Sequence, residues 1–199
     1  MGEVDGAELM LQAYVSPEYE EFQLRQIEEL VTQYGDLVEL WIDIPRVLSR
    51  SYRNRLYQFV TEKQPNMVVA MNNGIKDGAK LRTHWAWPTD VVTMERQLPP
   101  SLGGHQKLRM IENKTVYLPA EVCDVVGKHW FYNPEDAPRP DSELLGMYLL
   151  ARARGTNFLL NVGPSPEGVV PKSVADAFLR LGKNIKQMPD YGIEISGPQ

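Results

Sequence analysis

Residues 36–47 read DLVELWIDIPRV, and this stretch decides the fold. Apolar and β-prone positions lead directly to one carboxylate, Asp43, and Pro45 ends the pattern two residues later. A continuous apolar run bounded by turn residues predicts a buried strand of a parallel sheet. In folds of this kind, chemistry collects at the carboxyl ends of the strands, which is where Asp43 falls. From its position alone, Asp43 could equally cap the next helix or bond a loop amide.

The rest of the chain alternates helices with strands. Residues 18–34 carry apolar side chains at helical spacing, with Ser16 as the N-cap, Pro17 at the first helical position and Gly35 past the end. Further helices are predicted at 49–64, at 142–155 with Ser142 as N-cap and Gly155 as stop, and at 172–187. Further strands are predicted at 66–72, 115–122 and 157–161.

This alternation predicts an α/β fold of parallel βα units, whose strands are apolar throughout because helices and neighbouring strands cover both faces. Polar residues should then gather at the strand ends. Those predicted to end the four strands are Asp43, Asn72, Glu121 and Asn161. Residues 74–115 are predicted to form a long loop, and loops of that length within a compact domain are usually functional.

Composition excludes several classes of protein. A formal net charge of -5 and a pI near 5.3 argue against a nucleic-acid partner or an anionic membrane surface. One cysteine, Cys123, excludes an internal disulfide, and His84, His105 and His129 show no metal-ligand spacing. We therefore expect no metal and no cofactor. The first residues, MGEVDGAELML, do not resemble a signal peptide, no membrane span is expected, and no compartment is assigned.

Five ordered segments together resemble one family. They are ELWID, MNN, WPTDVVTMERQLPP, YLPAEVCDVVGKHWFYN and ARGTNFLLNVGPSPEGVVP, within residues 19–185. The set is similar to the α-L-fucosidases of glycoside hydrolase family twenty-nine. The Trp-x-Asp strand end and the NFLLNVGPSPEG turn are its most specific parts.

The resemblance implies a (β/α)8 barrel and a retaining mechanism, in which a carboxylate nucleophile and an acid/base carboxyl lie about 5 to 5.5 Å apart. Asp43 matches the nucleophile. The family's acid/base lies on variable loops, so two residues remain candidates: Glu95, which we prefer, and Glu121, which we predict to end the next strand. Asp90 is a weaker third. The non-catalytic alternative is that Glu95 is a solvated loop acid beside Arg96.

The resemblance also implies a sugar site. The apolar face and methyl group of fucose favour an aromatic platform with a few polar clamps. Trp41, Trp130 and Asn72 match substrate-binding positions, although a tryptophan in an α/β core is more often packing. Trp85 and Trp87 could wall the aglycone side or simply dock on the barrel rim.

Two departures from the family qualify this expectation. Gly74 stands where the family often has an arginine, whose contact Arg82 could supply. A closed barrel needs eight strands and about 250 residues, and four strands are evident here. We therefore expect residues 1–199 to be one partial catalytic domain, the second half of a TIM-type barrel without a second domain. Its uncovered apolar side chains, among them Val38, Leu40, Val69 and Leu159, predict self-association or a missing barrel half.

Three functions follow as alternatives. The first is a retaining exo-glycosidase that cleaves terminal α-L-fucosyl linkages of glycans, weakly or not at all if truncated. The second is a non-catalytic carbohydrate-binding fragment of such an enzyme. The third is an unrelated α/β domain for a phosphorylated ligand, which the absence of any Gly-x-Gly-x-x-Gly or Gly-x-x-x-x-Gly-Lys motif disfavours.

Overall fold

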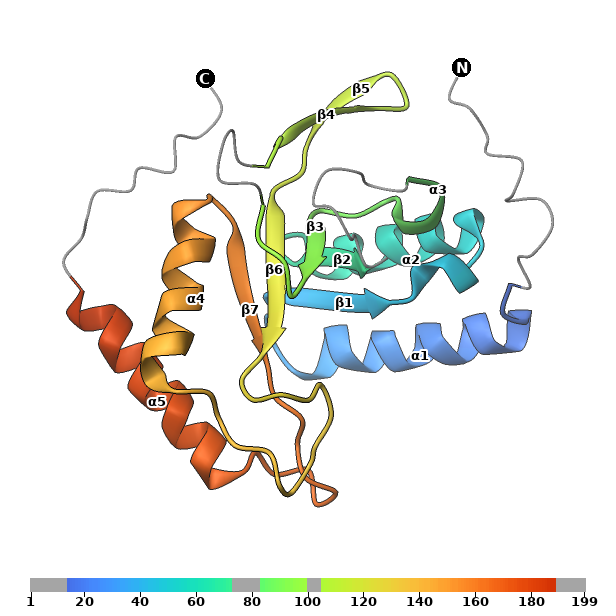
Figure 1. Ribbon diagram of the computed structural model, residues 1–199. Helices are drawn as coiled ribbons and strands as arrows, with labels where there is room; N and C mark the ends of the chain where they lie inside the picture. The colour runs from blue at the N-terminus through green and yellow to red at the C-terminus, as the bar shows by residue number, and fades with distance from the viewer. Residues whose placement is uncertain (1–13, 73–82, 100–104, 189–199) are drawn as a thin grey trace. The chain divides into compact units, whose positions relative to one another are not determined.

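The computed structural model describes residues 14–72, 83–99 and 105–188 (Figure 1). These residues form two compact units. Unit 1 holds the described residues up to Thr93 together with residues 109–118, and unit 2 holds the described residues among 94–108 and 119–188. The expected Gly74 and Arg82 features lie outside the described residues.

Unit 1 begins with a helix whose ends are set by local chemistry. The Ser16 side chain accepts a hydrogen bond from the backbone N–H of Tyr19, Pro17 occupies the first turn, and Gly35 follows the end with φ 74°. All three were predicted. The elements of the unit are α1 (Pro17–Gln33), β1 (Glu39–Asp43), η2 (Pro45–Val47), α2 (Arg50–Lys63), β2 (Val68–Asn72), α3 (Thr83–Ala86), the start of β3 (Val92–Glu95), and β4 (Leu108–Ile111) with β5 (Lys114–Tyr117).

Strands β1 and β2 are parallel, with Asp43 in register with Asn72 at their carboxyl ends. Alternate residues of these strands, including Leu40, Ile42 and Val69, are buried in one core with side chains of α1 and α2. The opposite strand face carries Trp41 and Asp43. Helices α1 and α2 therefore cover one face of β1 and β2. The opposite face carries the polar side chains at the strand ends, Asp43 and Asn72.

Unit 2 repeats the βα pattern. Strand β6 (Ala120–Val125) leads to α4 (Asp141–Ala153), and β7 (Asn157–Asn161) leads to α5 (Lys172–Gln187). β6 and β7 are parallel, and the sheet order is β3-β6-β7. Figure 1 shows α4 and α5 lying together beside β7, and their apolar side chains share a core with Leu160 and Val162.

The predicted long loop contains secondary structure. Residues 74–115 include α3, β3 and β4, so that expectation is wrong. β4 and β5 form a hairpin whose turn residues Glu112 and Asn113 both have positive φ, the type I′ geometry. The run 115–122 is two strands, because Pro119 has no N–H to donate to a sheet and separates β5 from β6.

Two further expectations are corrected. Ser142 is not an N-cap, since α4 begins at Asp141 with Pro140 in the cap position. Leu40 and Val69 do not lack an opposing layer, because they lie on the helix-facing side and are 8% and 0% exposed. Val38 does stand in solvent, at 84% exposed.

Candidate active site

Asp43 is the last residue of β1, and its carboxylate lies at the exposed end of the strand. Its Oδ1 accepts two hydrogen bonds, from the backbone N–H of Ile44 at 3.0 Å and from Asn72 Nδ2 at 2.9 Å. Within the described part of the chain, no hydrogen bond reaches Oδ2. One oxygen is therefore held in place, while no hydrogen bond from the described residues holds the other.

Asn72 is the last residue of β2 and is only 4% exposed. Its Oδ1 accepts a hydrogen bond of 2.6 Å from the hydroxyl of Thr93, which is 2% exposed. The three side chains form a line, Thr93 to Asn72 to Asp43, that links three strands. Thr93 was not predicted, because a threonine inside a short apolar stretch gives no distinguishing signal in the sequence.

The turn after Asp43 is strained and clamped. Ile44 adopts the left-handed conformation, φ 51° and ψ 47°, which is unfavourable for a β-branched residue. The buried guanidinium of Arg53 holds the chain that follows, donating to the carbonyls of Leu48 at 2.6 Å and Pro45 at 3.4 Å. Arg53 also donates to the carbonyl of Trp87 at 3.1 Å. This buried cation maintains a backbone geometry that an isolated chain would not favour.

Trp41 lies two residues before Asp43, on the same face of β1. It is partly buried, and its register partner on β2 is the small Ala70. Trp85 and Trp87 are also partly buried in unit 1.

Asp90, the weakest acid/base candidate, has its carboxylate engaged in hydrogen bonds within the fold. Its carboxylate accepts hydrogen bonds from the backbone N–H of Val69 at 2.8 Å and from the Tyr57 hydroxyl at 2.5 Å. Burial, reinforced by that bond to Asp90, raises the pKa of Tyr57 well above its usual range. Asp90 also precedes β3, so it lies at the amino end of the strand and away from its carboxyl end.

Glu95 is the last residue of β3 in unit 2, and its side chain is exposed. No ion pair or hydrogen bond from the described residues holds its carboxylate. Arg96 does not neutralise it, because Arg96 Nε pairs with Asp124 at 3.2 Å and its N–H bonds the Cys123 carbonyl at 2.8 Å. Within the part of the chain that the structure describes, Glu95 is thus an unpaired carboxyl at the carboxyl end of a strand.

Glu121 does not end its strand as predicted. It is the second residue of β6, is 2% exposed, and accepts a 2.6 Å hydrogen bond from Asn157, its register partner on β7. The error arose because Pro119 was read as part of one longer strand. Glu121 therefore lies at the amino end of the sheet, opposite the end that carries Asn161. The strand ends at Asp43, Asn72 and Asn161 were predicted correctly.

Trp130 lies in the loop after β6 and is partly buried. Its carbonyl accepts a 2.8 Å hydrogen bond from Nδ2 of Asn161. Gly163 lies so close to the same loop that a Cβ there would overlap the backbone of Phe131 and Tyr132. Asn161 and Gly163, in the NFLLNVGPSPEG turn, therefore hold the Trp130 loop in position.

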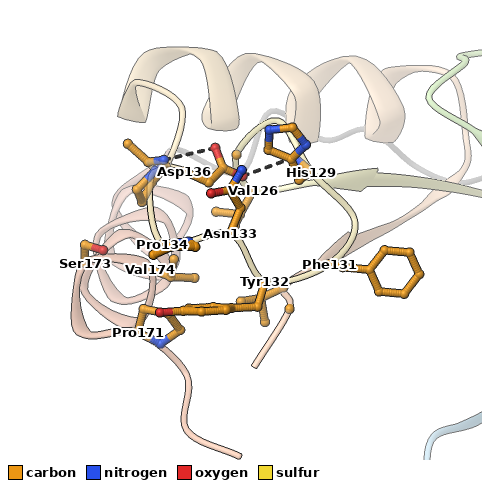
Figure 2. Close-up of a pocket in the computed structure, with 15 residues that line it drawn as sticks. Val126, His129, Phe131, Tyr132, Asn133, Pro134, Asp136, Pro171, Ser173 and Val174 are labelled. Carbon is orange, nitrogen blue, oxygen red and sulfur yellow. Dashed lines mark hydrogen bonds between the residues drawn. The ribbon is translucent and has the colours of Figure 1, made fainter. Parts of the chain in front are cut away.

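A small cavity of about 110 Å³ lies beside this loop (Figure 2). Its lining includes Val126, Phe131, Tyr132 and Val174, and the ring of Phe131 is directed away from the other labelled side chains. Asp136 shapes the wall, because its carboxylate accepts hydrogen bonds from the backbone N–H groups of Lys128, His129 and Ala137 at 3.0 to 3.1 Å. The Asp136 carboxylate is engaged in hydrogen bonds within the loop, so it gives no indication of a ligand-binding role.

The cysteine thiol and the possible metal-binding side chains do not indicate a second reactive site among the described residues. Burial, with help from nearby carboxylates, raises the pKa of Cys123 to about 12, so its thiol stays protonated and unreactive. Among the described residues, no three His, Cys, Asp or Glu side chains gather as metal ligands. No helix in the described ranges is long and apolar enough to cross a membrane.

Parallel βα units that place a carboxylate and amides at strand carboxyl ends define an α/β protein of the kind that binds or transforms ligands there. The family model described as alpha-L-fucosidase matches residues 5–189, and the chain belongs to that family. Alpha-L-fucosidase 1 of Arabidopsis thaliana is 28% identical over 166 residues, which are 77% of this chain and 32% of the plant protein.

Solved structures agree on the fold. Alpha-L-fucosidase isoenzyme 1 from Paenibacillus thiaminolyticus superposes with a TM-score of 0.63 at 24% identity, covering 92% of this chain and 42% of that one. Alpha-L-fucosidase AlfC from Lactobacillus casei, in complex with α-L-fucose, superposes with a TM-score of 0.57 at 23% identity. The match covers 82% of this chain and 43% of that one. The chain thus spans about a third to two-fifths of the length of these relatives.

Proposed function

We propose that this chain is the second half of the catalytic (β/α)8 barrel of a retaining α-L-fucosidase, which releases terminal α-L-fucosyl groups from glycans by double displacement. The observation that carries the proposal is Asp43, a carboxylate at a strand's carboxyl end with one oxygen held by two N–H donors and the other without a hydrogen bond from the described residues. Family membership supplies the substrate class.

Asp43 acts as the nucleophile. Oδ2 attacks the anomeric carbon, the glycosidic C–O bond breaks, and a glycosyl ester forms on Asp43. The held Oδ1 becomes the ester carbonyl oxygen, which can still accept the N–H groups of Ile44 and Asn72. The same two donors therefore serve the carboxylate, the ester and the carboxylate that leaves in the second step, without rearrangement.

Glu95 acts as the acid/base. Protonated, it gives its proton to the leaving oxygen in the first step. Ionised, it then takes a proton from a water molecule whose oxygen attacks the anomeric carbon and displaces Asp43. Its support is its place at the end of β3, its exposure and its lack of a neutralising partner among the described residues. Glu121 is not proposed, because it is buried at the amino end of β6 and bonded to Asn157.

Trp41, Trp130 and Asn72 bind the substrate in this proposal. Trp41 shares the face of Asp43, and Trp130 sits in a loop that follows the carboxyl end of β6. Aromatic faces suit the apolar side of a fucose ring, and Asn72 adds a polar contact beside the nucleophile. No cofactor takes part.

A barrel of this type needs eight strands, so we propose that the active unit is completed by strands beyond those described here, from further sequence or from a second copy. The alternative is a carbohydrate-binding fragment without turnover. It is favoured by the chain's 32% to 42% share of its relatives' length, since the missing strands would contribute to the site.

The test uses a mechanism-based 2-deoxy-2-fluoro-fucosyl fluoride. This reagent forms the glycosyl ester and hydrolyses it slowly, so mass spectrometry of the digested protein identifies the labelled residue. We expect label on the peptide that contains Asp43, together with release of nitrophenol from an aryl α-L-fucoside. Fucose binding without label or release would favour the binding fragment, and a label on another residue would overturn the assignment of Asp43.

A further inference from the structure

The line of Thr93, Asn72 and Asp43 has a fixed direction. A carboxylate only accepts hydrogen bonds, so Asn72 must turn its NH2 group toward Asp43, where Nδ2 lies 2.9 Å from Oδ1. The amide oxygen of Asn72 then faces Thr93, so the hydroxyl at 2.6 Å must donate. The geometry leaves one consistent assignment for all three groups.

The line is buried away from the reacting end. Thr93 and Asn72 are 2% and 4% exposed, while Asp43 is exposed. In such a place water cannot readily replace a lost hydrogen-bond partner, so the 2.6 Å bond from Thr93 helps to fix the orientation of the Asn72 amide. Without that bond the amide is less firmly oriented, and its NH2 group is less firmly held toward Asp43.

We propose that Thr93 is a positioning residue for the nucleophile: acting through Asn72, it holds Asp43 Oδ1 and leaves Oδ2 as the attacking oxygen. This inference rests on the proposed function. In this proposal Thr93 acts only through its bond to Asn72, since it is buried and its hydroxyl donates to the Asn72 amide oxygen.

A purely structural role is the competing explanation, and the chain offers a matched control. Thr89 is also buried, at 3% exposed, and its hydroxyl also ties residues 89–93 to β2, by bonds of 3.0 Å to the Met71 N–H and 3.2 Å to the Val69 carbonyl. Thr89 makes these bonds to backbone and not to Asn72. Loss of the Thr89 hydroxyl should therefore lower stability without disturbing Asp43.

The kinetic test compares Thr93→Val, Thr93→Ser and Thr89→Val in the full chain, in its active assembly. We expect Thr93→Val to lower kcat on an aryl α-L-fucoside by about 10- to 100-fold with KM changed less than about threefold, since small misplacement of a reacting group costs that much. Thr93→Ser keeps the donor and should stay within about threefold of wild type. Thr89→Val should lower the melting temperature and leave kcat within about threefold.

A double-mutant cycle tests the route through Asn72. If Thr93 acts only through the amide, Thr93→Val with Asn72→Ala should be no slower than Asn72→Ala alone. Additive losses would overturn that route. Equal kcat losses in Thr93→Val and Thr89→Val would overturn the positioning role and leave only a structural one.

A readout independent of turnover separates this inference from the proposed function. Nuclear magnetic resonance of the Asn72 side-chain NH2 should show slow hydrogen exchange in wild type and in Thr93→Ser, and exchange at least about tenfold faster in Thr93→Val. Unchanged exchange in Thr93→Val contradicts the inference whether or not the protein is active. Absent turnover and absent covalent label in wild type, with this exchange pattern intact, would instead refute the fucosidase assignment.

Discussion

Asn72 and Asp43 are register partners at the carboxyl ends of parallel strands β2 and β1, and the Asn72 amide donates to Asp43 Oδ1 over 2.9 Å. Strand pairing alone brings the two side chains to the same edge, and the burial of Asn72 makes the contact durable. The relationship therefore belongs to the scaffold and exists before any substrate binds.

Removal of Asp43, the proposed nucleophile, should abolish turnover. We expect Asp43→Ala to lower kcat on an aryl α-L-fucoside by about 1,000-fold or more. Added azide should restore part of the rate by attacking from the vacated side, giving a glycosyl azide of inverted configuration. The exposed Asp36→Ala is the control and should behave as wild type. Wild-type turnover in Asp43→Ala would contradict the role.

The effect of removing Glu95, the proposed acid/base, should depend on the leaving group. Poor leaving groups need protonation and activated ones hardly do, so Glu95→Ala should slow an alkyl or sugar fucoside far more than a dinitrophenyl fucoside. Glu121→Ala should show no such difference but should destabilise the fold by about 1 to 3 kcal/mol, because it removes a side chain that is 2% exposed together with its hydrogen bond from Asn157. If only Glu121→Ala shows the dependence, the two roles are reversed.

Gly163 should tolerate no side chain. A Cβ at this position overlaps the backbone of Tyr132, so Gly163→Ala should cost about 1 to 3 kcal/mol and displace the Trp130 loop. Gly182→Ala is the matched control in the interior of α5, where a Cβ meets nothing within 4 Å; it should stabilise by about 0.5 to 1 kcal/mol. Urea unfolding measures both. Equal stability of the two variants would show that the close approach is unimportant.

The Trp130 loop should be acid-sensitive. Burial works to raise the pKa of Asp136, but the backbone N–H groups of Lys128, His129 and Ala137 outweigh it and hold this pKa below its ordinary value. A depressed folded-state pKa contributes stability above the unfolded pKa of about 3.9, and that stability is lost as pH falls through the folded value. Tryptophan fluorescence should therefore change below about pH 4. The Asp136→Asn variant should lose that acid-induced fluorescence change. If the change is the same in the variant, a group other than Asp136 causes it.

The 199-residue chain should associate with itself. β1 and β7 each have a paired strand on one side only among the described residues, and Val38 and Leu179 are 84% and 73% exposed. Open strand edges and exposed apolar side chains favour pairing with another chain. Light scattering should show a dimer or larger species, and a hydrophobic dye should bind. A dye-silent monomer with full activity would contradict both this expectation and the proposed half barrel.

The sequence by itself determined the four long helices α1, α2, α4 and α5, the strands β1, β2 and β7, and the place of Asp43. Helical periodicity, Ser16, Gly35 and Gly155 mark their elements through local backbone chemistry, which depends on neighbours in the chain. The same holds for the apolar run that ends at Asp43. These features were predictable because each is encoded within a few consecutive residues.

Only the tertiary structure decided which polar residues contact one another and at which end of a strand each acid lies. Glu121 and Glu95 are both acids near strands, but strand boundaries and pairing put Glu121 at the amino end, bonded to Asn157, and Glu95 at a carboxyl end without a partner among the described residues. Thr93 lies 21 residues from Asn72 along the chain and bonds it over 2.6 Å. Such contacts depend on register and burial, and these arise only when distant segments pack against one another.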